Sequence, residues 1–72
     1  MACINPDGTL TPTALRVLKA AEQPKTAAEL AQLLALPLYR VRSSLRELVA
    51  GGFLKQEAEQ YVLTDTGREK LG

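Results

Sequence analysis

The sequence predicts an α+β fold that is mostly helical, and two observations carry this prediction. Apolar residues recur at steps of three and four in three segments, at 12–22, 26–34 and 37–50. This spacing is typical of helices that bury one face. After the last of these segments, the apolar residues instead form two short clusters around a polar middle, which is typical of a β-hairpin. The 72 residues suffice for a single domain over 1–72.

The first ten residues precede these segments and contain a turn signal. Asn5, Pro6 and Gly8 stand in the order that a type I turn prefers. Ile4 and Leu10 flank the turn on its two sides. We therefore expect residues 1–10 to form an N-terminal arm or a very small hairpin.

The first helix is expected over residues 12–22. The hydroxyl of Thr11 can cap its start, and Pro12 at the first helical position loses no needed donor. Its buried face carries Leu15, Leu18 and Ala21 or Glu22. Pro24 ends the helix, because proline cannot continue the hydrogen-bond ladder.

The second helix begins with a capping box. The Thr26 hydroxyl can accept from the amide of Glu29, and the Glu29 carboxylate can reach back to the Thr26 amide. Its predicted buried stripe consists of Leu30, Leu33 and Leu34.

The third helix is expected over residues 37–50. Pro37 makes a good first helical residue, and the two glycines at 51–52 end the helix. With 100° between successive residues, one face carries the apolar side chains that we assign to the core: Leu38, Val41, Leu45 and Leu48.

The hairpin and a last short helix complete the chain. Strands are expected around residues 53–54 and 61–63, with an acidic turn near 57–60. Thr64 can cap a final helix, in which Asp65 complements the helix dipole.

In this order the elements resemble a winged helix-turn-helix domain: a three-helix core, a two-stranded wing and a short C-terminal helix. The segments "TAAELAQLLALPLYRVRSSLRELVAGGFL" and "YVLTDTGREKL" are similar to the helix-turn-helix and wing exit of MarR-type and related bacterial and archaeal regulators. The resemblance covers roughly residues 11–71. It implies a small prokaryotic DNA-binding transcriptional regulator, in which helix 37–50 enters the major groove and the wing touches the backbone or the minor groove.

Three features depart from that family pattern. Ala35 stands where the family places glycine, so a positive φ there would cost about 1 kcal/mol relative to glycine. Pro37 replaces the usual capping serine or threonine. Glu57 and Glu59 make the wing acidic, although the negatively charged phosphate backbone attracts positive side chains.

The polar face of the third helix holds the main candidate DNA contacts. Tyr39, Ser43 and Arg46 lie opposite the buried face, with Arg42 on one flank and Arg40 on the other. Arginine can donate two parallel hydrogen bonds to guanine or hold a phosphate. Segment 37–55 carries four basic residues against one acid, a balance of +3 in a chain of net charge +1. An ordinary solvated face is the alternative interpretation, above all for Arg40.

Four further residues complete the predicted site. Thr26 and Gln32 are candidate phosphate contacts from the second helix, although capping is the structural role of Thr26. Lys55 and Gln56 are the candidate contacts from the wing.

Composition argues against catalysis and against a metal site. The chain has no histidine, and its one cysteine, Cys3, is read as a small residue near a mobile end. We therefore expect no enzyme activity, no cofactor and no metal. The start lacks the pattern of a signal peptide and no apolar run is long enough to cross a membrane, so the chain is expected to be cytoplasmic.

Double-stranded DNA is thus the first expected partner. Useful specificity would require a homodimer on two half-sites or a protein partner. The alternative is a winged-helix module for protein–protein interaction without DNA, which the near-neutral charge and acidic wing favour. Its interface would use exposed apolar residues of the first helix, the N-terminal arm or Leu71.

Overall fold

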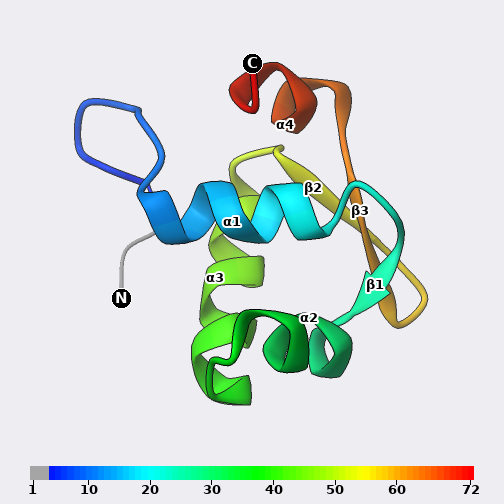
Figure 1. Ribbon diagram of the computed structural model, residues 1–72. Helices are drawn as coiled ribbons and strands as arrows, with labels where there is room; N and C mark the ends of the chain where they lie inside the picture. The colour runs from blue at the N-terminus through cyan, green and yellow to red at the C-terminus, as the bar shows by residue number, and fades with distance from the viewer. Residues whose placement is uncertain (1–3) are drawn as a thin grey trace.

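Over residues 4–72 the protein is an α+β structure, about half helical, with four helices and a three-stranded antiparallel sheet (Figure 1). The computed structural model describes residues 4–72, so the expectation for Cys3 lies outside the described residues. Along the chain the elements are α1 (Pro12–Ala20), β1 (Lys25–Thr26), α2 (Ala27–Leu34), α3 (Leu38–Ala50), β2 (Leu54–Glu57), β3 (Gln60–Leu63) and α4 (Asp65–Lys70). The helical share is therefore smaller than the sequence predicted.

Threonine side chains cap three of the four helices, as predicted. Thr11 Oγ1 accepts from the amide of Ala14 at 3.2 Å, and Thr64 Oγ1 accepts from the amide of Gly67 at 3.1 Å. At Thr26 both bonds of the capping box are present. These caps satisfy amides that have no partner inside their own helix.

The helix boundaries differ from prediction at two places. The first helix ends at Ala20 rather than at residue 22, because Ala21 leaves helical geometry while its amide still bonds to Leu18. The third helix begins at Leu38, so Pro37 is the residue before the helix and offers no side-chain cap. The Pro37 carbonyl nevertheless accepts from the amide of Val41 at 3.2 Å, which starts the helical ladder.

The turn between α2 and α3 contains a left-handed residue at the position where the family pattern has glycine. Ala35 has φ 56° and ψ 42°, and its amide donates to the Gln32 carbonyl at 3.3 Å. A second alanine, Ala58, has φ 57° in the tight turn between β2 and β3. Left-handed geometry is costly for any residue with a Cβ atom, so both alanines store strain.

The sheet has the order β1-β3-β2, with β3 in the centre. The hairpin of β2 and β3 was predicted, and its register pairs Leu54 with Leu63 and Gln56 with Tyr61. Strand β1 was not predicted, because two residues carry no periodic signal. It pairs Lys25 with Tyr61, and so ties the start of α2 to the hairpin.

The core lies between α1, α2, α3 and the base of the hairpin, and is almost entirely aliphatic. Its fully enclosed members include Val17, Leu18, Leu30, Val41, Leu45 and Leu48. The prediction of burial was wrong for two residues, because Leu33 is 60 % exposed and Leu38 is 37 % exposed. Leu30 and Leu34 already fill the buried side of α2, and Leu38 is the first residue of α3, at the edge of the core.

Residues 4–10 form the small hairpin that the turn signal predicted. Ile4 and Leu10 pair as an isolated bridge, and the amide of Gly8 donates to the Asn5 carbonyl at 2.9 Å. Leu10 is buried and Ile4 packs against the core, so this segment belongs to the packed structure. Within residues 4–72, none of the helices has the length and apolar character needed to cross a membrane.

Candidate nucleic-acid interface

The exposed side of α3 carries polar side chains at helical spacing. Tyr39 and Ser43 are four residues apart, as are Arg42 and Arg46, so the four side chains share one side of the helix, and all are exposed. Tyr39 is the most open of the large apolar or aromatic side chains of residues 4–72, at 71 % exposure. Arg40 is only half-buried on the flank of the helix. Four side chains predicted on the polar face of α3 are therefore exposed to solvent.

Part of this face lines a shallow groove between α3 and the β2–β3 hairpin. The groove has a volume of about 320 Å³ and is lined by Arg42, Arg46, Val49, Gln56 and Tyr61. Arg42 and Arg46 are one helical turn apart, so their guanidinium groups follow the same edge of the helix. We call this set of five residues the α3–hairpin groove. Tyr39, Arg40 and Ser43 do not line it.

The pleat of the hairpin decides which of its side chains reach the groove. Leu54 faces the core, and Gln56 lies on the same side of β2 because side chains alternate along a strand. Tyr61 is the cross-strand partner of Gln56 and shares that side. Lys55 points to the other side, where its ammonium lies 3.6 Å from the Glu57 carboxylate. The structure therefore brings Gln56, but not Lys55, to α3.

A second hollow extends the groove toward the start of α2. It shares Arg42, Gln56 and Tyr61 with the first, and adds Thr26, the two following alanines and Glu59. Arg42 thus lies where α2, α3 and the hairpin meet. Thr26 also lines this hollow.

The capping box limits what Thr26 can offer to a ligand. Its hydroxyl accepts from the Glu29 amide at 3.2 Å, while its own amide donates to the Glu29 carboxylate at 2.9 Å. The bond from the Thr26 amide is the main reason that the pKa of Glu29 lies below its ordinary value. A carboxylate already occupies the positive end of α2, so Thr26 acts as a cap. Gln32, the other candidate of α2, lines a different hollow.

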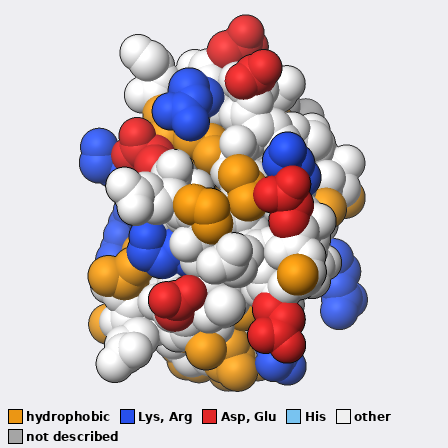
Figure 2. Space-filling model, turned by 90° about the vertical axis from the view of Figure 1, so that its right-hand side faces the viewer, with side chains coloured by type: hydrophobic (Ala, Val, Ile, Leu, Met, Phe, Trp, Pro, Cys, Tyr) orange, Lys and Arg blue, Asp and Glu red, His pale blue; other side chains and the backbone are white. Residues whose placement is uncertain are grey.

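The charge of the site is modestly positive. Two guanidinium groups, from Arg42 and Arg46, face one carboxylate, from Glu59. The view onto the sheet side shows acidic and basic side chains interspersed, without a large area of one sign (Figure 2). In this groove, therefore, attraction for a polyanion comes from Arg42 and Arg46 rather than from a broad basic surface.

Sequence reasoning overlooked Tyr61 as a member of the site. The signal was present, because the buried Leu54 and Leu63 fix which residues of the hairpin share their side of the sheet. The same alternation would have favoured Gln56 over Lys55. The 4–72 segment also contains no cluster of three or more side chains able to hold a metal ion.

Comparisons with protein-family models, with curated proteins and with solved structures find no match to this chain.

Proposed function

We propose that this chain is a winged helix-turn-helix module that binds double-stranded DNA, with α3 as the major-groove helix and the β2–β3 hairpin as the wing. The function would be transcriptional regulation. The observation that carries the proposal is the α3–hairpin groove, in which Arg42 and Arg46 stand exposed beside Gln56 and Tyr61.

The geometry of α3 suits this role. Its 13 residues extend over about 20 Å, and its outer face carries donors and an aromatic ring rather than a continuous apolar stripe. A helix of this kind fits the major groove, which is about 12 Å wide. Tyr39 and Ser43 would face the bases, while Arg42 and Arg46 would hold phosphates or guanine edges.

Gln56 and Tyr61 would complete the contact from the wing. Both lie on the side of the hairpin that faces Arg42, and both carry hydrogen-bond donors suited to phosphate oxygens. Lys55 takes no part in this arrangement because it lies across the sheet beside Glu57. A single module of this size makes few contacts, so regulation would require a dimer on two half-sites or a protein partner.

Fluorescence anisotropy with a labelled random duplex tests the proposal. The dissociation constant should lie near 1–100 µM, roughly the range of non-specific DNA binding, and should rise steeply with salt. Arg42→Ala and Arg46→Ala should each flatten the logarithmic salt slope by about one unit for each phosphate that the arginine neutralises. Lys55→Ala is the matched control, since it removes a cation outside the groove. Absence of binding at ~10 mM salt would refute the proposal for this chain.

The alternative is a protein–protein interaction module without DNA binding. The exposure of Leu38 and Tyr39 at the start of α3 favours it, because these apolar surfaces could meet a protein instead of bases. The first helix, the N-terminal hairpin and Leu71, named above for such an interface, contribute none of the large exposed apolar side chains of residues 4–72. The salt titration distinguishes the two functions.

A further inference from the structure

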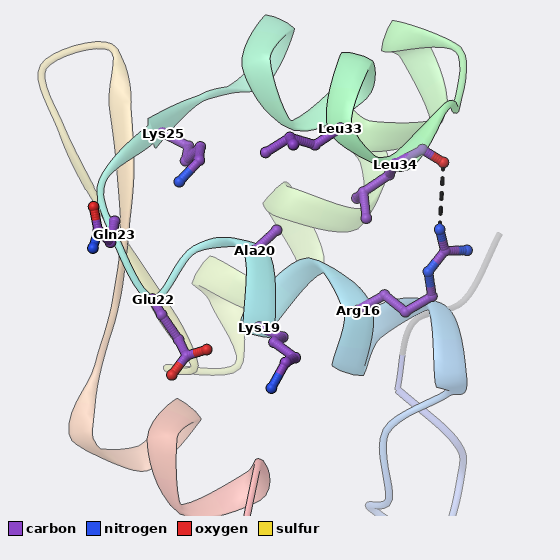
Figure 3. Close-up of a pocket in the computed structure, with 8 residues that line it drawn as sticks. All are labelled: Arg16, Lys19, Ala20, Glu22, Gln23, Lys25, Leu33 and Leu34. Carbon is purple, nitrogen blue, oxygen red and sulfur yellow. Dashed lines mark hydrogen bonds between the residues drawn. The ribbon is translucent and has the colours of Figure 1, made fainter.

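Another hollow of the surface lies between α1 and α2, away from the α3–hairpin groove. It has a volume of about 660 Å³ and is lined by Arg16, Lys19, Ala20, Glu22, Gln23, Lys25, Leu33 and Leu34 (Figure 3). We call it the α1–α2 groove. None of its lining residues belongs to α3, β2 or β3.

The floor of the α1–α2 groove is apolar. Leu33 extends from α2 into the space between the helices, and Ala20 of α1 points toward it from below (Figure 3). Leu33 keeps 60 % of its surface exposed, although its neighbour Leu34 is almost fully buried. Covering this exposed apolar side chain would remove its surface from water, which is favourable in free energy.

The groove continues past Leu33. A smaller hollow of about 340 Å³ is lined by Lys25, Glu29, Gln32 and Leu33, so the two hollows share Leu33 and Lys25. Both are open to solvent rather than enclosed. Sites for small molecules bury most of their ligand, whereas an open track along a helix suits a peptide segment that lies on it.

The rim of the groove is basic. Around the larger hollow, Arg16, Lys19 and Lys25 are opposed by the carboxylate of Glu22, a balance of +2. The smaller hollow adds Glu29, so the balance over both hollows is +1. The guanidinium of Arg16 is held at the end of α2, where it donates to the Leu34 carbonyl at 3.5 Å. Lys25 points into the hollow from β1 (Figure 3). Carboxylates are the groups that this rim attracts, and a second copy offering the same face would set cations against cations.

We propose that the α1–α2 groove docks an acidic amphipathic segment of another protein. Apolar side chains of that segment cover Leu33 and Ala20, and its carboxylates pair with Lys25, Lys19 and Arg16. Because α3 and the hairpin are not involved, the chain can hold this partner and a ligand of the α3–hairpin groove at the same time.

The test is a selection of random 12-residue peptides displayed on phage, against the intact 72-residue chain. The enriched peptides should combine Leu, Ile or Phe with Asp or Glu, and should carry a net negative charge. A synthetic copy of one enriched peptide is then titrated by calorimetry. Amide shifts in a nitrogen-15 spectrum should change along α1 and α2.

Variants locate the binding site. Leu33→Ala should weaken the peptide about tenfold, because it removes an exposed apolar side chain and leaves the core intact. Lys25→Glu and Lys19→Glu should weaken it as much or more, and Lys19 lies outside the sheet, so its replacement leaves strand pairing alone. Leu38→Ala and Lys70→Glu are the matched controls outside the groove and should change affinity less than twofold.

Three results would overturn the proposal: no enriched peptide, enriched peptides without acidic residues, or a peptide affinity that neither Leu33→Ala nor the two charge reversals lower. Sedimentation equilibrium adds a fourth. If the chain dimerises and Leu33→Ala abolishes the dimer, the groove is an interface between copies and the proposed acidic partner is wrong.

Discussion

Replacing Ala35 by glycine should stabilise the protein, although glycine usually weakens a helix. Ala35 ends α2 with φ 56° and ψ 42°, in the left-handed region. That region costs about 1–2 kcal/mol for a residue with a Cβ atom. Glycine removes this cost but adds entropy to the unfolded chain, worth about 0.5–1 kcal/mol. The net expectation is a gain of roughly 0.5–1 kcal/mol.

Thermal unfolding followed by circular dichroism measures this gain. For a domain of this length, 1 kcal/mol corresponds to about 4–8 °C in Tm, so Ala35→Gly should raise Tm by about 2–8 °C. The methyl group of Ala35 is exposed, so its loss removes no packing. Ala58→Gly, at φ 57°, should shift Tm in the same direction.

Ala28→Gly is the opposite-sign control, because Ala28 is exposed inside α2 and has ordinary helical geometry. It should destabilise the protein by about 0.5–1 kcal/mol. An unchanged or lowered Tm for Ala35→Gly, together with a lowered Tm for Ala28→Gly, would refute the assignment of strain to the α2–α3 turn.

The remaining predictions concern the last helix, the capping box and the groove. Gly67→Ala should lower the free energy of unfolding in urea by about 1–3 kcal/mol, because a Cβ atom at Gly67 would meet the backbone carbonyl of Phe53. This clash should outweigh the higher helix propensity of alanine. A stabilised variant would contradict the docking of α4. Thr26→Ala should cost about 1 kcal/mol of unfolding free energy, and an unchanged value would exclude the cap. The capping bond places the pKa of Glu29 lower in the folded than in the unfolded chain, so its stabilisation is present above pH 4.5 and is lost as pH falls through the folded value. Glu29→Gln should therefore flatten the acid limb of a plot of stability against pH, and an identical limb would be inconsistent with the bond. Glu59→Gln should tighten DNA binding, because it removes the carboxylate that lines the same hollow as Arg42; weaker binding would argue against the groove as the DNA site.

Local signals in the sequence were sufficient for most elements. The capping box of Thr26 and Glu29 and the turn at Asn5–Gly8 depend only on neighbouring residues, and the structure has both. Strand β1 escaped prediction because its two residues become a strand only by pairing with β3. Helical spacing likewise could not separate Leu33 from Leu34, since burial depends on which side of α2 the other helices cover.

Only the part of the candidate site that depends on local spacing was predicted. The spacing of Arg42 and Arg46 places them together on α3 without any tertiary information. Their meeting with Gln56 and Tyr61 depends on how the hairpin packs against α3, which the sequence expresses only through the alternation around Leu54 and Leu63. Lys55 was chosen for its charge, without regard to its side of the strand, and it lies beside Glu57 rather than in the α3–hairpin groove.

The salt dependence of duplex DNA binding tests the central claim most directly. We expect a logarithmic affinity that falls linearly with logarithmic salt, with a slope that Arg42→Ala and Arg46→Ala each reduce by about one unit and that Lys55→Ala leaves nearly unchanged. Absence of binding at ~10 mM salt would contradict the claim, and so would a slope that responds to Lys55→Ala as strongly as to the two arginine variants.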